Sequence, residues 1–333
     1  NSGRYTTMGA LVATMRNGAT LYRVHIEESC VINLKQSFAG GIVGKFNRTE
    51  DFSPKNELGY DLEGVTLVGI YDSTNSAPII ITGGGNAVAG GIVGDANIAN
   101  SIYKFEMVIS NCVNTASISP QKDLVVDSEF CLGGFVGERD FNLTGNAGVL
   151  KIIDSSNYGD ISAIGGESSY GGFIGHTYRA AKTQFIRCQN RGNIGGLVRE
   201  NGEALMVGYA AGFIGIVSDL YVGNPFDFVD CANYGDVACG KYAGGFLSYV
   251  AGNGGHHLAL SMVNCANYGT ISINDTVNGA AGQTFATFDT DMSYGSFTLT
   301  ISNCLLTSSD VYGRIMEQSK EGKIIESVEL NHT

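Results

Sequence analysis

Short segments in which apolar and polar residues alternate recur along the whole chain. Clear examples cover residues 105–109, 226–229, 258–262 and 297–301. A period of two is typical of a β-strand with one buried face. No stretch of 10–12 residues combines a helical period with helix caps, so the pattern predicts an all-β protein.

A Cys or Ser follows each alternating segment, and a turn sequence such as Asn-Tyr-Gly comes directly after it. Asn and Gly both tolerate positive φ, and the apolar residue after the turn is expected to open a second strand. The copies start at Cys112, Ser155, Cys188, Cys231 and Cys265. Self-similarity of this kind indicates a repeat architecture with a constant frame and loops of variable length.

A second motif, two Gly or Ala-Gly followed by two apolar residues and usually a Gly, alternates with the first. Its copies cover residues 40–44, 90–94, 133–137, 171–175, 211–215 and 244–248, with worn copies at 8–12 and 281–285. We interpret it as a third short strand, with glycine where chain segments crowd. Three strands per unit, stacked unit on unit, predict a right-handed parallel β-helix of about eight coils. A β-propeller is the alternative architecture, but it needs four strands per repeat.

Stacked coils place equivalent residues in rows, called ladders below. One ladder is expected to contain the turn asparagines Asn114, Asn157, Asn190, Asn233 and Asn267. Their amides would stack at the strand spacing of about 4.8 Å and hydrogen-bond along the axis. A second ladder is expected to contain the small corner residues Cys112, Ser155, Cys188, Cys231, Cys265 and Cys304, with Cys30 and Ser73 as first members.

The sequence leaves the redox state of the cysteine ladder open. Stacked cysteines fall within the Cα range of a disulfide, but side chains that point the same way form a row of buried thiols. Cys131 and Cys239 lie outside the ladder, and both are expected to be free. No Cys-x-x-Cys occurs, which gives zinc-ribbon and thioredoxin-type sites no support.

Composition and charge exclude several classes of protein. The formal net charge is −12 and no Lys/Arg stripe is present, which argues against nucleic acid and anionic membrane surfaces. No apolar run approaches the roughly 20 residues of a membrane span. Hydrophobic residues make up 44% of the chain, so disorder is not expected. Residues 1–333 are interpreted as one repeat domain, a segment of a longer chain.

The two motifs together resemble the GLUG repeat, with the best matches at Gly41–Gly44, Gly91–Gly94, Gly134–Gly137, Gly172–Gly175 and Gly212–Gly215. That repeat occurs in bacterial surface and secreted proteins, including regions of IgA peptidases and filamentous-haemagglutinin-like adhesins. The resemblance implies an extracellular or cell-surface β-solenoid stalk or adhesive region. It supplies no catalytic residues, and the corner cysteine is not part of the core motif.

An enzyme is the alternative, because many pectin-cleaving enzymes are β-helices. Hydrolysis would need two or three converging carboxylates. Asp160 and Asp236 share a turn position, but Asn193 lies between them, and a turn Asp more often satisfies backbone amides. No catalytic motif emerges, and no cofactor is expected. Calcium remains an alternative for an acidic chain without an Asp-x-Asp-x-Asp loop.

Some surface features point to partners. Tyr158, Tyr234 and Tyr268 are expected to pack in the turns or to form an exposed strip on which sugars could stack. Sequons that mark glycosylation sites in expected loops begin at Asn47, Asn142, Asn274 and Asn331. The sequence thus favours a structural or adhesive protein with variable loops, lateral or end-to-end protein partners that could form a filament, and glycans as ligands. A carbohydrate-active enzyme or carbohydrate-binding module is the alternative.

Overall fold

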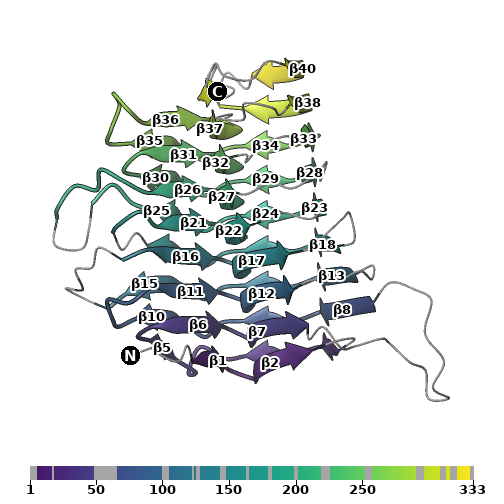
Figure 1. The fold of residues 1–333 in the computed structure, drawn as a ribbon, viewed down its shortest axis with the longest axis vertical. Helices are drawn as coiled ribbons and strands as arrows, with labels where there is room; N and C mark the ends of the chain where they lie inside the picture. Colours follow the sequence, from purple (N-terminus) through teal and green to yellow (C-terminus); the bar gives the residue numbers. More distant parts are fainter. Residues whose placement is uncertain are drawn as a thin grey trace.

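The computed structural model shows a parallel β-helix, as the alternation predicted (Figure 1). It describes residues 6–16, 19–48, 66–99, 105–121, 124, 128–142, 148–162, 165–178, 182–198, 202–218, 226–251, 257–289, 296–307, 313–315 and 321–330. No helix occurs among these residues, and therefore none long and apolar enough to span a membrane. Successive coils stack with parallel pairing into four sheets, which we name A to D.

Sheets A and B are joined by the Gly-Gly motif. Sheet A contains β1 (Thr7–Gly9), β6 (Ser37–Gly40), β11 (Ala87–Gly90), β16 (Phe130–Gly133), β21 (Ser169–Gly171), β26 (Tyr209–Ala211), β31 (Tyr242–Gly244) and β36 (Ala280–Gly282). Sheet B contains β2 (Val12–Arg16), β7 (Val43–Arg48), β12 (Val93–Ala99), β17 (Val136–Asn142), β22 (Ile174–Tyr178), β27 (Ile214–Ser218), β32 (Leu247–Ala251), β37 (Phe285–Asp289) and β39 (Arg314–Ile315).

Sheet C has a long arm and a short arm that meet at the Cys or Ser corner. The long arm contains β3 (Thr20–Tyr22), β8 (Thr66–Tyr71), β13 (Phe105–Ser110), β18 (Gly148–Ile153), β23 (Lys182–Ile186), β28 (Phe226–Val229), β33 (His257–Val263), β38 (Ser296–Leu306) and β40 (Glu321–Leu330). The short arm contains β4 (His25–Ile26), β9 (Thr74–Asn75), β14 (Val113–Asn114), β19 (Ser156–Asn157), β24 (Gln189–Asn190), β29 (Ala232–Asn233) and β34 (Ala266–Asn267).

Sheet D follows the Asn turn and leads back to sheet A of the next coil. It contains β5 (Ile32–Leu34), β10 (Ile79–Ile81), β15 (Ile118–Pro120), β20 (Ile161–Ser162), β25 (Ile194–Gly195), β30 (Val237–Cys239) and β35 (Ile271–Ile273). We number coils from the N-terminus, so that coil 1 runs from β1 to β5 and coil 8 begins at β36. Coils 1 to 7 are complete, which agrees with the expected number of about eight.

The strand count per coil differs from the prediction, because each coil has five short strands where three were expected. The Gly-Gly motif is not a strand. It is the tight corner at which sheet A turns into sheet B, as in Gly40-Gly41 between β6 and β7. A Cβ on Gly40 would lie 1.8 Å from the Val43 carbonyl oxygen, so this bend excludes any larger side chain.

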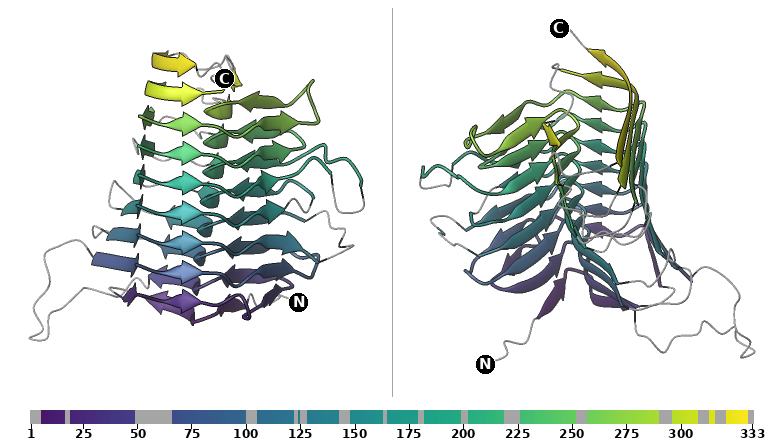
Figure 2. Two further views of the ribbon diagram at one scale, coloured as in Figure 1. Left: turned by 180° about the vertical axis from the view of Figure 1, so that it is seen from behind. Right: turned by 45° about the horizontal axis from the view of Figure 1, so that its top comes forward.

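Two apolar layers fill the coils. Sheet B packs against sheet C through one core cluster, in which Phe135, Phe173, Phe213 and Phe246 stack at centroid distances of 4.7–4.8 Å. Sheet A packs against sheet D through a second cluster that contains Ile79, Ile118, Ile161, Ile194 and Val237. The cross-section therefore has two lobes, which Figure 2 shows from above the C-terminal end.

The connections from sheet B to the long arm of sheet C differ most in length. Residues 179–181 separate β22 from β23, whereas residues 49–65 separate β7 from β8. The motif spacing predicts that the longest loop runs from Phe46 to Leu62. Most of that segment lies outside the described residues, and β7 itself extends to Arg48. Variable segments thus begin on one edge of a constant frame.

Candidate functional site

The turn asparagines form a hydrogen-bonded row between the two lobes. Each Nδ2 donates to the Oδ1 of the next coil: Asn114 to Asn157 at 2.9 Å, Asn157 to Asn190 at 2.8 Å, Asn190 to Asn233 at 2.8 Å and Asn233 to Asn267 at 2.7 Å. Each Nδ2 also donates to the carbonyl two residues onward in its own turn. All five side chains are fully buried, so the row satisfies polar groups that would otherwise be costly inside the fold.

The row has two members that the sequence reasoning missed. Asn75 donates to Asn114 at 3.2 Å from the coil below, and the likeness of its Asn-Ser-Ala turn to the Asn-Thr-Ala turn at Asn114 could have revealed it. At the other end, Asn267 donates to Oε1 of Gln283 at 2.5 Å. Gln283 ends the row. It belongs to the corner between sheets A and B, whereas the other members lie in the Asn turns.

The second glycine of each corner lies directly against the asparagine of its own coil. A Cβ on Gly172 would approach the Asn190 Oδ1 to 2.5 Å and the Gly212 carbonyl oxygen of the next coil to 2.1 Å. The same contacts recur at Gly91, Gly134 and Gly212. The two sequence motifs are therefore two halves of one packing unit, because the glycine makes room for the amide.

The corner between the arms of sheet C holds a row of small residues. Cys112, Cys188, Cys231, Cys265 and Cys304 occupy it and are buried, with Ser73 in coil 2 and Ser155 in coil 4. The thiols donate to carbonyl oxygens, as from Cys188 to Ile152 at 3.2 Å. All eight cysteines of the chain lie in described positions and are free. Burial raises the pKa of Cys112 to about 12.

The assignment of Cys30 to this row was wrong. Cys30 is exposed and follows the turn at Glu27, where its amide donates to the Glu27 carbonyl at 3.1 Å. Val24 occupies the corner in coil 1, and its amide donates to the Ser73 hydroxyl at 3.0 Å. An apolar residue therefore replaces the small polar one in the first coil.

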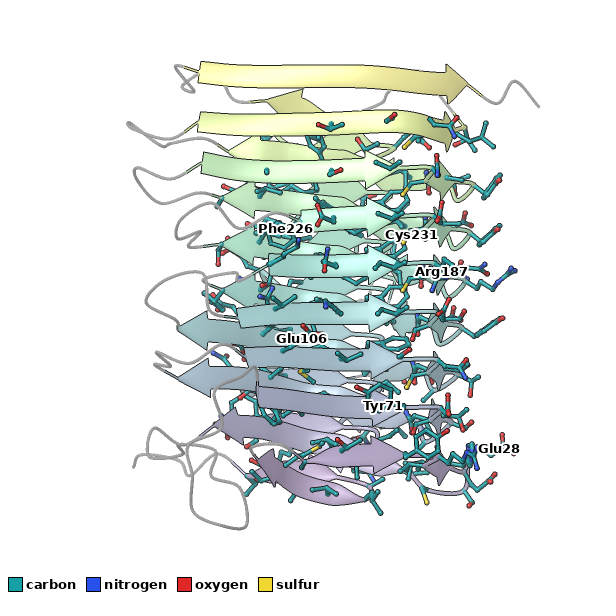
Figure 3. The ribbon with its side chains drawn as sticks, turned by 90° about the vertical axis from the view of Figure 1, so that its right-hand side faces the viewer. Glu28, Tyr71, Glu106, Arg187, Phe226 and Cys231 are labelled. Atoms are coloured by element: carbon teal, nitrogen blue, oxygen red, sulfur yellow. The ribbon has the colours of Figure 1, made fainter. Side chains whose placement is uncertain are left out.

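The residue before each corner has a left-handed backbone, with φ between 50 and 55°. These residues are Arg23, Asp72, Asn111, Asp154, Arg187, Asp230, Asn264 and Asn303. Most are Asn or Asp, the residues that tolerate this conformation best after glycine. Their side chains link neighbouring coils outside the corner, as where Arg187 contacts Asp154 at 2.5 and 2.8 Å, and Figure 3 shows Arg187 projecting from this edge. The Arg187 guanidinium holds the pKa of the Asp154 carboxyl below its usual value.

The turn carboxylates do not converge as a hydrolase would require. Asp160 Oδ1 accepts the Asn193 amide at 2.7 Å, Asn193 Oδ1 accepts the Asp236 amide at 3.1 Å, and Asp236 Oδ1 accepts the Thr270 amide at 2.9 Å. Each side chain thus fixes the backbone of the next coil. The sequence expected local turn amides as partners, and the partners lie instead one coil onward.

A crease runs along the outside of the junction between sheets A and B, and there the structure brings together a thiol and an imidazole. Cys131 Sγ lies 3.7 Å from His176 Nδ1, and His176 Nε2 lies 2.8 Å from the Ser218 hydroxyl. Burial lowers the pKa of His176 to about 3. Burial and the carboxylates of Glu138 and Glu129 raise the pKa of Cys131. A reactive cysteine needs electropositive surroundings, so this geometry does not favour a nucleophilic thiolate.

The expected tyrosine strip lies on the outer side of the Asn turns, one residue after each asparagine. Tyr234 and Tyr268 stack on one another at 4.9 Å with 12° between their planes. The Arg191 guanidinium lies 4.3 Å from the Tyr234 centroid and 5.8 Å from that of Tyr158. Tyr234 therefore has Arg191 on one side and Tyr268 on the other, and both tyrosines remain about two-fifths exposed.

The sequons do not all lie in loops. Asn47 and Asn142 belong to strands β7 and β17, and Asn331 lies outside the described residues. The Asn274 amide donates to the carbonyls of Leu197 at 2.5 Å and Leu205 at 2.7 Å, so a glycan there would displace two hydrogen bonds. In the part of the chain that the structure describes, no group of three His, Cys, Asp or Glu side chains could hold a metal ion.

Comparisons with known proteins place the chain in no family. No protein-family model matches it, and no curated protein matches it. A crystal structure of a putative immunoglobulin A1 protease from Bacteroides ovatus aligns with a TM-score of 0.42 and 16% identity, covering 89% of this chain and 78% of that one. A likeness at this level carries no argument about function.

Proposed function

We propose that the protein is an extracellular, non-enzymatic β-solenoid of the GLUG-repeat type that acts as a structural or adhesive element at a cell surface. The observation that supports this most directly is the buried amide row from Asn75 to Gln283. It links six coils and the corner of coil 8 along one axis. A frame held in this way keeps the variable segments between sheets B and C at fixed positions.

Single-molecule pulling of the chain by its two ends tests the mechanical part of the proposal. We expect stepwise unfolding, because each coil contacts its neighbours only. Asn190→Ala should lower the force of the central steps, while Asn193→Ala, which removes one solvent-exposed hydrogen bond to the Asp236 amide, should lower it much less. One featureless extension at low force in the wild type would contradict a load-bearing role.

A panel of polysaccharides incubated with the purified chain tests the enzymatic alternative. We expect no new reducing ends or unsaturated products, because the turn carboxylates Asp160 and Asp236 are each engaged by the backbone of the next coil. Release of oligosaccharides that survives repurification of the chain would overturn the non-enzymatic assignment.

Self-association through coil 1 is a second candidate function. Among the described residues, strands β1 to β5 have a neighbouring strand on one side only, and Leu11, which is equivalent to the buried Ile42, is 51% exposed. Unpaired strands with exposed apolar residues favour edge-to-edge pairing. We expect sedimentation to show concentration-dependent assembly that Leu11→Lys abolishes, whereas Val277→Lys, at an exposed site on coil 7, should not. Monomers at every concentration would exclude this candidate.

A further inference from the structure

The tyrosine strip ends at Tyr158, and the change of residue there leaves one ring face uncovered. The equivalent positions of coils 4 to 7 are Tyr158, Arg191, Tyr234 and Tyr268, whereas those of coils 2 and 3 are Ser76 and Thr115. Arg191 lies over one face of Tyr158. On the other side the small Thr115 cannot cover the ring, and the Tyr158 side chain is half exposed.

An open groove lies on that side of Tyr158, across the Asn turns of coils 1 to 4. Its walls include Glu28, Ser76, Thr115, Ser117, Tyr158 and Asp160, and its volume is about 610 Å³. Figure 3 shows Glu28 at the coil 1 end of this edge of the molecule. The volume lies within the roughly 300–1,000 Å³ of small-molecule sites. An open shape suits a segment of a longer polymer, which can enter and leave along the groove.

The groove combines an aromatic face with hydroxyls and two separated carboxylates. The negative face of an aromatic ring attracts polarised C–H groups. The hydroxyls of Ser76, Thr115 and Ser117 both donate and accept hydrogen bonds, and the carboxylate of Asp160 accepts them. We propose that this groove binds a neutral oligosaccharide, with a sugar ring stacked on Tyr158 and sugar hydroxyls bonded to Asp160 and the hydroxyl row. This inference rests on the proposed surface role and names its ligand class.

The arrangement fits a neutral sugar better than a cationic peptide. Glu28 and Asp160 lie three coils apart, about 14 Å at the strand spacing, which is too far to clamp one ammonium group. Hydroxyls occupy the wall between them, and Thr115 Oγ1 donates to Ser76 Oγ at 2.8 Å. The Arg191 guanidinium beside Tyr158 also opposes a second cation there.

The binding groups are fixed before any ligand arrives. The Tyr158 amide donates to the Asn114 carbonyl at 2.7 Å, and the Thr115 amide donates to the Asn75 carbonyl at 2.8 Å. Asp160 is held by the Asn193 amide at 2.7 Å. A rigid site loses little conformational entropy on binding, and tyrosine supplies contact area with few rotatable bonds.

Titration of the full chain with cellohexaose, chitohexaose and mannohexaose tests the inference, with hexalysine as the cationic comparison. We expect at least one sugar to bind. Tyr158→Ala should weaken that binding about tenfold or more, the usual effect of removing a central aromatic contact. Thr115→Tyr should abolish it while keeping the Tyr158 ring, because a new ring would cover the Tyr158 face and one hydroxyl of the row would be lost. Tyr268→Ala is the matched control, since it removes an exposed tyrosine of the same strip outside the groove.

Three results would overturn the inference: no binding of any of the sugars, equal weakening by Tyr158→Ala and Tyr268→Ala, or binding of hexalysine alone. Far-ultraviolet circular dichroism of each variant checks the fold, and all three substituted side chains are partly or largely exposed. Loss of the sugar site would leave the stepwise unfolding of the frame unaffected. The failure of this inference is therefore distinguishable from the failure of the proposed structural role.

Discussion

At the residue scale, the buried imidazole of His176 should make the fold sensitive to acid. Its pKa is lowered to about 3 by burial, whereas an unfolded chain takes up this proton below about pH 6.5. Between these pH values the unfolded state binds more protons than the folded state. The neutral imidazole therefore contributes fully to the unfolding free energy above pH 6.5, and this contribution decreases as the pH falls toward 3. At pH 5 the loss amounts to about 2 kcal/mol.

Replacing His176 with Phe should remove this part of the acid sensitivity. When the pH is lowered from 7.5 to 5, the unfolding free energy of the wild type should fall by about 2 kcal/mol more than that of His176→Phe. Urea titrations at both pH values measure it. Ser218→Ala keeps the imidazole and should retain the wild-type dependence. Parallel pH profiles for wild type and His176→Phe would contradict the assignment.

Cys30 should be the one rapidly reactive thiol of the native protein. It is exposed, whereas the corner cysteines are buried and burial raises the pKa of Cys112 to about 12. Cys131 is half-buried, but burial of its thiol and the nearby carboxylates raise its pKa and suppress the thiolate. Titration with DTNB should release about one equivalent quickly, and Cys30→Ser should remove it. If Cys30→Ser still released a fast equivalent, and mass spectrometry mapped it to Cys131, the crease would contain an activated thiol.

Part of the residue-scale chemistry was readable in the sequence. The left-handed corner residues could have been found from the dipeptides Asn111-Cys112, Asp154-Ser155 and Asp230-Cys231, because Asn and Asp favour positive φ. The pair of Cys131 and His176 could not. These residues lie 45 positions apart in different motifs, and they meet only because sheet A bends into sheet B at the glycine corner.

At the element scale, we expect an interruption of the amide row to cause a large loss of unfolding free energy. Asn190→Ala leaves the Asn157 Nδ2 without its acceptor and the Asn233 Oδ1 without its donor, both fully buried. Two unsatisfied buried groups cost about 2–6 kcal/mol in total. Equilibrium unfolding in guanidinium measures the loss. Asn193→Ala, which removes one exposed hydrogen bond to the Asp236 amide from the same turn, should cost less than about 1 kcal/mol. Equal losses would mean that the row contributes little.

Gln283 stands where other coils have the second corner glycine, and we expect it to cap the row. A side chain is tolerated there because β36 is the last strand of sheet A, whereas a Cβ on Gly172 would strike the Gly212 carbonyl of the following coil. Its Oε1 accepts from Asn267 and from Thr307 at 2.8 Å. Gln283→Met keeps the length but removes the acceptor, and should cost about 1–3 kcal/mol.

The loss should be local to the last coils. Amide hydrogen exchange of Gln283→Met should rise at β34 and β38 and stay unchanged at β9 and β14. Thr307→Val is the matched control, because it removes only the second donor to the same oxygen. Faster exchange along the whole row would show that the end of the row does not act as an independent cap.

At the element scale the sequence predicted the stacking better than the strand count. Fixed motifs with apolar alternation indicated parallel coils, because only stacking buries every copy in the same way. The two-residue strands of the short arm, such as β24, are too short to show any period. The apolar residues after the glycine motif predict a strand, but the crowding of Gly40 against the Val43 carbonyl forces a corner there.

At the scale of the whole molecule, stability is a sum over neighbouring coils. Every coil contributes to both lobes, and the stacked phenylalanines contact only the coils above and below, as Phe173 contacts Phe135 and Phe213. Such an array has no single nucleus whose loss unfolds everything at once. Its ends differ from its middle, because strands β1 to β5 pair on one side only.

Native-state hydrogen exchange should reveal this gradient. We expect the highest protection in coils 4 to 6, paired on both sides, and the lowest in coil 1. Phe185→Ala, which removes a ring stacked on Phe228 at 5.0 Å, should lower protection mainly in coils 4 to 6. Phe46→Ala in coil 2 is the matched control, since it should affect coils 1 to 3 instead. An equal loss of protection in every coil from either variant would mean that the chain unfolds as one cooperative unit and that nearest-neighbour stacking does not govern its stability.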